Sequence, residues 1–337
     1  MIGNAGSGVL GAATVNRRNV LIIARSEYCN TTHSPSDPLN GTEFNKQLER
    51  DLASPKGGNV DVSLLAVPLF TKEGPARVHI AVDWPWKSLK PKSDTVGIVG
   101  IVLRKDGSLV TRFSDSCEVN YLCRHNSTDD EFGPIWDHIL TRYETQLVLP
   151  PGEYDLRVVL SDGTRSGRAE IPLAVEAFDG KELAISPVSL CKQIDDVSAS
   201  SSGHPTRLSS ARTAKLPGNY APLVSGDIEF KPIGDTRFKK KDTLYTYFEV
   251  YEPLLGTEPS TTVDFRVRIA DVKTGELRSD SPPVSATPYM KPGSTVIPIG
   301  RRTNISNLPK GSYRLDVQAT DSAGKTTPWR SVNFTVD

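Results

Sequence analysis

The sequence predicts a mainly β protein built from two β-sandwiches in tandem. The phrase L-P-P-G-E-Y-D-L-R-V at 149–158 returns as L-P-K-G-S-Y-R-L-D-V at 308–317, and a repeated phrase marks two copies of one structural unit. From the tyrosine of each copy onward, apolar and polar residues alternate, which is the period of a half-buried strand. The length of 337 residues is too great for one ordinary sandwich and suits two domains with extensions.

We expect three segments along the chain. Residues 1–58 form an N-terminal extension with one strand and one amphipathic helix, residues 59–178 form the first sandwich, and residues 179–337 form the second. A polar, Ser-rich stretch at 192–224 is expected to be a long surface loop of the second domain. The alternative is an interdomain linker, but a linker would leave the apolar run before it without a partner strand.

The N-terminal extension contains one apolar run at 19–25, which we expect to be a short strand. A helix follows, because Thr42 can cap it and three apolar residues recur at a spacing of four: Phe44, Leu48 and Leu52. Such a helix is expected to pack on a sheet through this one face.

The first sandwich is expected to contain strands at 60–67, 77–83, 95–104, 108–113, 143–149 and 167–175. A further strand is expected from Tyr154 of the first repeated phrase onward. The run at 96–103 is almost continuously apolar, which predicts a central strand covered on both faces. Asp106 and Gly107 predict a hairpin turn. A long insertion at 114–141 follows, and insertions of this kind on rigid scaffolds are common places for binding sites.

The second sandwich is expected to contain strands at 183–191, 227–231, 243–251, 262–270, 294–299 and 332–336. A further strand is expected from Tyr313 of the second repeated phrase onward. The strand at 262–270 alternates cleanly, so four of its side chains should point inward: Val263, Phe265, Val267 and Ile269.

Each repeated phrase places a tyrosine, Tyr154 or Tyr313, two residues after a glycine. In a tyrosine corner, the hydroxyl of such a tyrosine bonds back to the backbone of the preceding connection. This feature belongs to Greek-key sandwiches, so the predicted fold narrows to immunoglobulin-like or fibronectin type III-like domains. The alternative to a tyrosine corner is a generic turn before a strand in another β fold. The occurrence of the phrase twice in the chain disfavours this alternative.

Composition excludes several classes of function. Lys and Arg number 40 and Asp and Glu number 40, so nothing favours nucleic acid or an anionic membrane as a partner. No apolar run approaches the roughly 20 residues that a transmembrane helix needs. The N-terminus has no basic residue before its weakly apolar stretch, so no signal peptide is visible.

No enzymatic, cofactor or metal site is expected. The phrase G-S-G-V-L-G at 6–11 matches a dinucleotide-binding pattern, but no strand precedes it and no helix pattern follows. None of the five histidines stands in a nucleophile context. His79 alternates with apolar neighbours, so we expect it on a strand facing solvent. The acidic residues Asp129, Asp130 and Glu131 match no calcium loop.

Two cysteines, Cys117 and Cys123, lie six residues apart in a polar loop, where a local disulfide is sterically easy. A buried or free thiol is the alternative for each of them, and spacing does not choose between the two.

The strand at 243–251 turns three tyrosines away from its own core: Tyr245, Tyr247 and Tyr251. Tyrosines gathered on an outward sheet face can form a recognition surface, because each offers a large contact area with a polar end. These three residues are therefore the candidate contacts for a ligand or a protein. The competing interpretation, which we favour, is that the loop at 192–224 covers them.

Several phrases in this order resemble one protein family: R-S-E-Y-C at 25–29, L-E-R-D-L-A-S-P at 48–55, V-D-V-S-L-L-A-V-P-L-F at 60–70, and both repeated phrases. Together they resemble the region after the A domain in bacterial von Willebrand factor A-related proteins, over most of residues 19–337. The resemblance implies an exported protein, extracellular or periplasmic. The family's metal-dependent motif D-x-S-x-S belongs to its A domain, which precedes the region that this chain resembles, so no metal residue is carried over.

The sequence and the resemblance together predict a non-enzymatic, exported binding, adhesion-type or spacer module of two immunoglobulin-like domains. Its partner would be an unidentified protein or glycan. The alternative is an accessory region of a secreted hydrolase that binds carbohydrate. Saturable glycan binding through the tyrosine face would favour this alternative.

Overall fold

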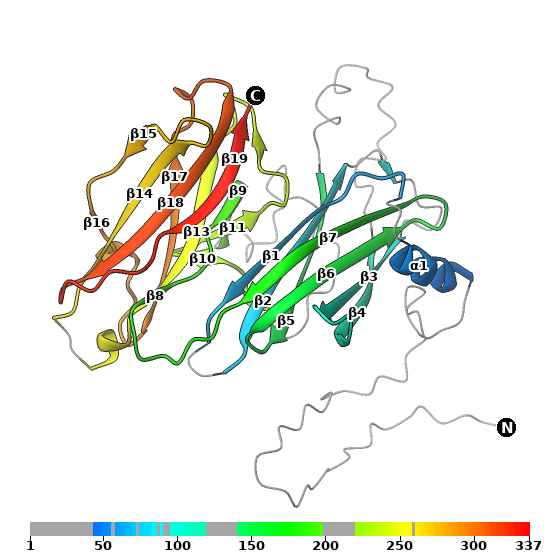
Figure 1. Cartoon of the computed structure of the whole chain (residues 1–337), viewed down its shortest axis with the longest axis horizontal. Helices are drawn as coiled ribbons and strands as arrows, with labels where there is room; N and C mark the ends of the chain where they lie inside the picture. The colour runs from blue at the N-terminus through cyan, green and yellow to red at the C-terminus, as the bar shows by residue number, and fades with distance from the viewer. Residues whose placement is uncertain are drawn as a thin grey trace, which may run out of the picture.

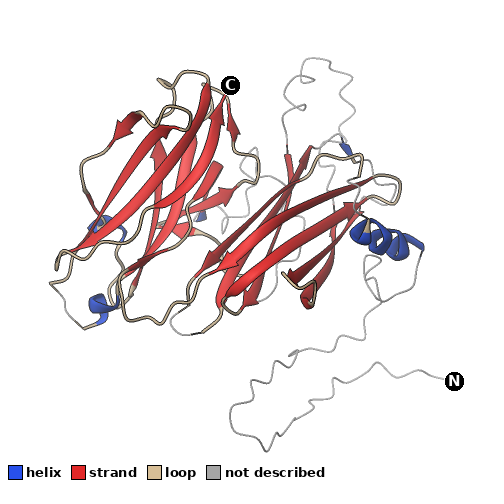
Figure 2. Cartoon of the chain, viewed as in Figure 1, coloured by secondary structure: helices blue, strands red, loops and turns tan. Residues whose placement is uncertain are grey.

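The computed structural model describes residues 43–54, 58–71, 74–85, 88–89, 95–118, 140–197, 220–257 and 260–337. Within these ranges the protein is mainly β, with one α-helix and four β-sheets that pack as two sandwiches (Figures 1 and 2). The core of the first sandwich draws on residues 60–175 and that of the second on residues 185–336. The strand predicted at 19–25 lies outside the described residues.

The first sandwich consists of a three-stranded and a four-stranded antiparallel sheet. The three-stranded sheet has the order β1 (Ser63–Leu69), β2 (Ala76–Pro85), β5 (Leu140–Leu149). The four-stranded sheet has the order β4 (Leu109–Glu118), β3 (Thr95–Arg104), β6 (Gly152–Ser161), β7 (Ser166–Val175). The inward side chains of both sheets meet in one core, in which Trp84 is almost fully buried.

Strand β3 is covered on both faces, as its continuous apolar run predicts. Ile98 and Val102 point into the sandwich core, whereas Val99 contacts helix α1 (Glu43–Ala53) on the outer face. The helix buries Leu48 and Leu52 against this strand and against β6, so the predicted amphipathic helix is confirmed.

The second sandwich pairs two larger sheets. One has the order β10 (Val224–Ser225), β11 (Ile228–Pro232), β9 (Ser189–Asp196), β13 (Leu244–Tyr251), β17 (Val296–Thr303), with β8 (Ala184–Ile185) on β13. The other has the order β12 (Arg237–Phe238), β19 (Arg330–Val336), β18 (Gly311–Asp321), β14 (Val263–Asp271), β15 (Leu277–Asp280), with β16 (Val284–Ser285) on β14. Two short 3₁₀ helices, η4 (Pro253–Gly256) and η5 (Thr287–Tyr289), lie in the connections.

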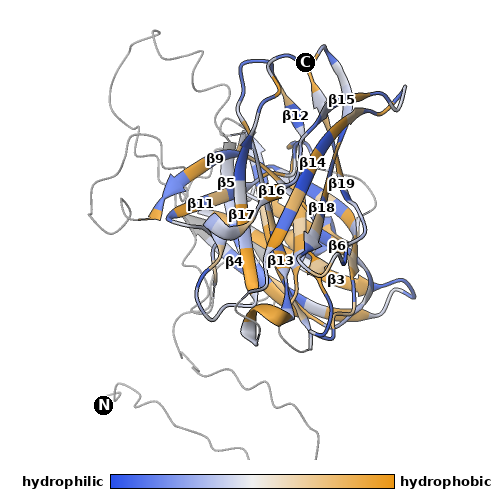
Figure 3. Cartoon of the chain, turned by 90° about the vertical axis from the view of Figure 1, so that its left-hand side faces the viewer, coloured by the Kyte–Doolittle hydropathy of each residue, from blue (hydrophilic) through white to orange (hydrophobic). Residues whose placement is uncertain are grey.

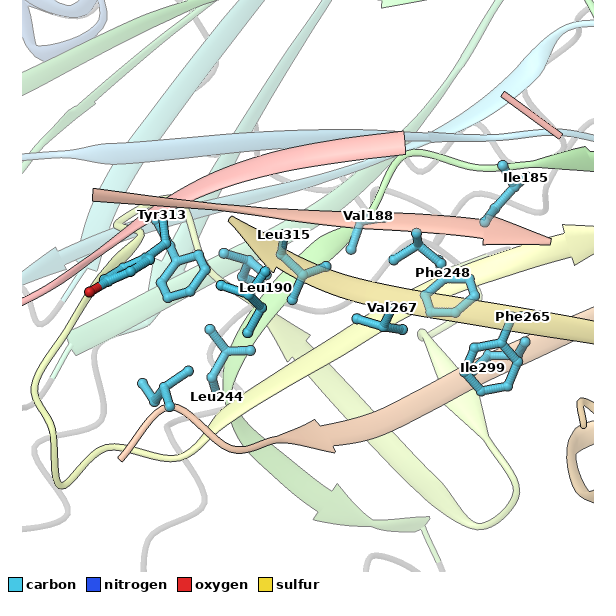
Figure 4. Packing of buried hydrophobic residues seen from close by; sticks show 14 of the residues in the cluster. Ile185, Val188, Leu190, Leu244, Phe248, Phe265, Val267, Ile299, Tyr313 and Leu315 are labelled. Atoms are coloured by element: carbon cyan, nitrogen blue, oxygen red, sulfur yellow. The ribbon is translucent and has the colours of Figure 1, made fainter. Parts of the chain in front are cut away.

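The core of this sandwich forms where the two sheets face each other (Figure 4). Phe248 of β13 and Phe265 of β14 meet edge to face, with their ring centroids 5.7 Å apart. Hydrophobic and hydrophilic segments alternate along strands such as β14 (Figure 3), and its four residues predicted to point inward are all buried. The pattern of alternation therefore reports the inner face of this strand correctly.

Both repeated tyrosines make the hydrogen bond expected of a tyrosine corner. The Tyr154 hydroxyl donates to the Pro150 carbonyl at 2.8 Å, and the Tyr313 hydroxyl donates to the Pro309 carbonyl at 2.7 Å. The repeat extends to the next turn, where Asp162 and Asp321 each accept a backbone N–H at 2.8 Å, from Arg165 and Lys325 respectively. One phrase thus fixes two successive connections in each sandwich.

The structure differs from the prediction at the start of the second sandwich. The strand expected at 183–191 is divided into β8 and β9, because Pro187 has no N–H for the ladder. Strand β9 then continues to Asp196 and pairs with β11, so the segment predicted as a loop at 192–224 begins and ends as strand. Residues 198–219 lie outside the described residues.

Candidate functional site

The outer faces of two sheets, one from each sandwich, meet in a contact that we call the joint. It lies between β1, β2 and β5 of the first sandwich and β9, β11 and β13 of the second (Figure 1). Its apolar part contains residues from both sides: Val67, Leu69, Cys191, Leu223, Phe230 and Tyr247. A third hydrophobic core therefore connects the two sandwiches.

Residues 220–234, which we call the strap, extend from the second sandwich onto the first. At one end the Tyr220 hydroxyl donates to Glu144 at 3.0 Å. The neighbouring Ala221 donates its backbone N–H to the side-chain Oε1 of Gln146 at 3.1 Å, and its carbonyl accepts a bond from Gln146 Nε2 at 2.6 Å. At the other end, a Cβ added to Gly234 would lie 2.7 Å from the Leu64 nitrogen. The strap is thus in close contact with β5 and β1.

A charged cluster fills the polar part of the joint. Lys231 Nζ lies 2.5 Å from Glu229 and 3.9 Å from both Glu144 and Asp195. Beside it, Arg142 Nε donates to Asp83 at 2.7 Å. Buried charges of this kind are tolerated only when paired, and removal of one partner is strongly destabilising. The cluster therefore selects one relative placement of the strands that carry it.

The pKa values of three groups in the joint are shifted chiefly by burial. Burial lowers the pKa of His79 to about 3, and Arg142, Lys231 and Arg77 lower it further. Burial also raises the pKa of the Cys191 thiol. It raises the pKa of Asp83 too, against the opposing effect of Arg142. At neutral pH, Cys191 is a thiol and not the nucleophilic thiolate, and the low pKa of His79 makes its ring a weak base.

The prediction that His79 faces solvent is wrong, because its side chain is only 1% exposed. Alternation along β2 does place it on the outer face of its own sandwich. However, that face is covered by the strap, and the ring centroids of His79 and Tyr220 are 5.7 Å apart. The period of a strand shows which side a residue faces but not whether that side is covered.

The tyrosine face also lies in the joint. Tyr247 and Tyr251 are 2% and 3% exposed, and both donate their hydroxyl hydrogen to Glu249, which is itself buried. The Tyr251 hydroxyl also accepts the backbone N–H of Phe70 from the first sandwich at 3.0 Å.

Tyr245 is part-buried beside Phe230, with ring centroids 6.3 Å apart. The cover over this face therefore comes from the first sandwich and the strap. Contact of the three tyrosines with an external ligand stays a prediction.

The segment at 176–183 connects the two sandwiches and is held to both. Phe178 stacks on Phe70, with centroids 4.8 Å apart, and also contacts Tyr251. Glu176 forms a bidentate ion pair with Arg330 of β19. A groove of about 840 Å³ lies beside this segment and is lined by residues that include Pro75, Pro150, Pro151, Phe178, Asp179 and Glu182.

Of the two cysteines predicted to form a disulfide, the structure describes only the first. Cys117 lies in β4 opposite Val96, but Cys123 and the acidic residues at 129–131 lie outside the described residues. The disulfide therefore stays a prediction. In the part of the chain that the structure describes, no three His, Cys, Asp or Glu side chains gather as a metal site would require. In the same part, no helix has the length and apolar character needed to span a membrane.

No family model matches this chain, and no curated protein matches it. Among solved structures it is similar to a "putative beta-galactosidase" from Bacteroides fragilis, at 16% identity over 34% of this chain and 16% of that one, with a TM-score of 0.24. It is also similar to red sea bream transglutaminase, at 8% identity over 88% of this chain and 34% of that one, with a TM-score of 0.20. Neither likeness is close enough to transfer an activity.

Proposed function

We propose that this chain is a non-enzymatic, exported binding or spacer module in which two immunoglobulin-like or fibronectin type III-like sandwiches act as one rigid unit. The exported, adhesion-type setting rests on the resemblance to the region after the A domain of von Willebrand factor A-related proteins. The remaining support comes from strand order and from the joint.

Strand order supports a tandem of related domains. The sheet β4-β3-β6-β7 of the first sandwich has a counterpart in β15-β14-β18-β19 of the second, and the corner tyrosine lies on the third strand of each. The sheet β1-β2-β5 likewise corresponds to β9-β13-β17. Two sheets with these orders fit the immunoglobulin-like and fibronectin type III-like architectures.

The joint is the single observation that carries the proposal. Flexible arrays expose a short linker between domains that barely touch, whereas here a hydrophobic core and a buried charged cluster connect the sandwiches. The histidine and the cysteine of the joint, His79 and Cys191, are both buried from solvent. This arrangement suits a protein that holds two surfaces at a fixed separation better than one that turns over a substrate.

The experiment that tests this proposal asks whether the joint holds without the covalent connection. A specific protease site inserted between Gly180 and Lys181 allows the chain to be cut in the exposed segment between the sandwiches. We expect the two halves to co-elute in size-exclusion chromatography at micromolar concentration and neutral pH. Separate elution of two folded halves would contradict the proposal. A matched variant with Lys231→Ala, which breaks the buried cluster, should separate more readily.

A further inference from the structure

We infer that the joint is sensitive to acid, because protonation of His79 releases the strap from the first sandwich. This inference rests on the proposed function, since it concerns the same joint. It depends on three groups in a row, each in contact with the next: the ring of His79 on β2, the side-chain amide of Gln146 on β5, and the backbone of Ala221 in the strap.

The first step concerns which ring nitrogen of His79 carries its proton. The two hydrogen bonds between Gln146 and the backbone of Ala221 fix the orientation of the Gln146 amide. Its Nε2 therefore lies 3.4 Å from His79 Nδ1 as a donor, so Nδ1 must accept. The proton of the neutral ring is then on Nε2, which lies 4.0 Å from Glu144.

The second step follows from adding a proton. A proton on Nδ1 would meet the N–H of Gln146, so two donors would face each other. Gln146 can present its oxygen to His79 only by rotating, and rotation would break both bonds to Ala221. The charge state of His79 is in this way coupled to the attachment of the strap.

The charged surroundings of His79 oppose protonation as long as the joint is closed. Three cationic side chains lie around it: Arg77, Arg142 and Lys231. The carboxylates of the joint are Glu144, Asp83, Asp195, Glu229 and Glu249. The other titratable groups of the joint are Tyr220, Tyr245, Tyr247, Tyr251 and Cys191, and β1 contributes none.

The direction of the effect follows from linkage. His79 has a pKa of about 3 in the closed joint and would have its usual value of about 6.5 in an open one. Opening therefore takes up one proton, and the equilibrium constant for opening rises about tenfold for each pH unit below about 6. Between pH 7 and pH 5 it rises about 25-fold. Asp83, whose pKa is raised in the closed joint, acts in the opposite sense at lower pH.

The test is hydrogen exchange of the Ala221 amide in the intact chain, corrected for the intrinsic pH dependence of exchange. We expect protection of this amide to fall about 25-fold from pH 7 to pH 5. The Phe230 amide, which bonds to Leu223 within the strap, is the control and should stay protected. A His79→Gln variant keeps every carboxylate of the joint and should lose the pH dependence.

Two outcomes would overturn the inference: constant protection of Ala221 in the unaltered chain, or the same fall in the His79→Gln variant. If that variant does not fold, the His79 ring can be titrated by NMR in the unaltered chain. The linkage requires the pKa of the ring in the closed joint to lie well below its usual value of about 6.5, and a ring pKa near 6.5 would overturn the inference. Separation of the cut halves at neutral pH, by contrast, would contradict the proposed function itself.

Discussion

Single polar groups close the connections of both sandwiches. The Tyr154 and Tyr313 rings are buried, and each hydroxyl donates to the backbone carbonyl four residues earlier in the corner. Asp162 and Asp321 then accept backbone N–H groups in the following turns. The repeated phrase is thus a set of hydrogen bonds as well as a pattern of apolar residues.

Replacement of the corner tyrosines tests this role. Tyr154→Phe and Tyr313→Phe should each lower the free energy of unfolding by about 1–2 kcal/mol, because a part-buried carbonyl loses its donor and the ring stays in place. Urea unfolding measures the change. Tyr245→Phe, which keeps its ring contact with Phe230, is the matched control and should change stability by less than about 0.5 kcal/mol. Equal effects at all three positions would contradict a special role for the corners.

At the scale of elements, helix α1 covers a face that would otherwise be open. Val99 and Val159 are both fully buried, although they point away from the core of the first sandwich. Leu48 and Leu52 of the helix supply the cover. The helix therefore stabilises the four-stranded sheet as an outer layer.

Truncation of the helix contact should be costly. Leu48→Ala removes a fully buried side chain and should lower the free energy of unfolding by about 2–4 kcal/mol, as judged by urea unfolding. Ala53→Gln, at an exposed position in the last turn, should change it by less than about 0.5 kcal/mol. A small effect of Leu48→Ala would mean that the helix is not an integral layer.

The sequence predicts most strands because alternation and turn residues are local signals. Strand β3 begins and ends at the predicted residues, and β13 and β14 begin and end within one residue of their predicted bounds. The same two-residue alternation predicts which side chains of a strand point into the core. The corner tyrosines are predictable because the phrase is repeated.

The joint is not predictable in the same way, since outward residues look alike whether solvent or another sheet covers them. His79 alternates as an exposed residue would, and the buried charges of β2 and β5 resemble solvated ones. One signal was present: the run L-L-A-V-P-L-F at 64–70 is apolar on both faces of β1, which is typical of a strand covered twice. The strap offers no such signal, because its contacts join residues far apart in the chain.

At the scale of the whole molecule, the joint sets the relative placement of the two sandwiches. Close backbone approach at Gly234, the buried charges around Lys231 and the stacked ring of Phe178 all act on this one contact. None of these groups lies in the core of either sandwich. Changes here should therefore alter how the sandwiches are held together more than how each one folds.

Gly234→Val should open the joint, since the added carbon would overlap the backbone of Leu64. Cys191 reports the opening, because it is fully buried in the joint and burial raises the pKa of its thiol. In the unaltered chain we expect Cys191 to resist alkylation at pH 8, and in the variant we expect it to react. Peptide mass spectrometry identifies the labelled cysteine.

The control for this prediction is Lys240→Ala, which changes an exposed residue in the turn after β12. In this variant Cys191 should stay unreactive. Rapid labelling of Cys191 in the unaltered chain would mean that the joint is already open.

The most direct test of the central claim is the rotational diffusion of the two sandwiches, measured by ¹⁵N relaxation of the intact chain at neutral pH. The measurement uses amides of β2 to β7 for the first sandwich and of β13 to β19 for the second. A rigid joint predicts that one diffusion tensor, with the correlation time of the whole molecule, fits both sets. Two separate and shorter correlation times, one for each sandwich, would contradict it.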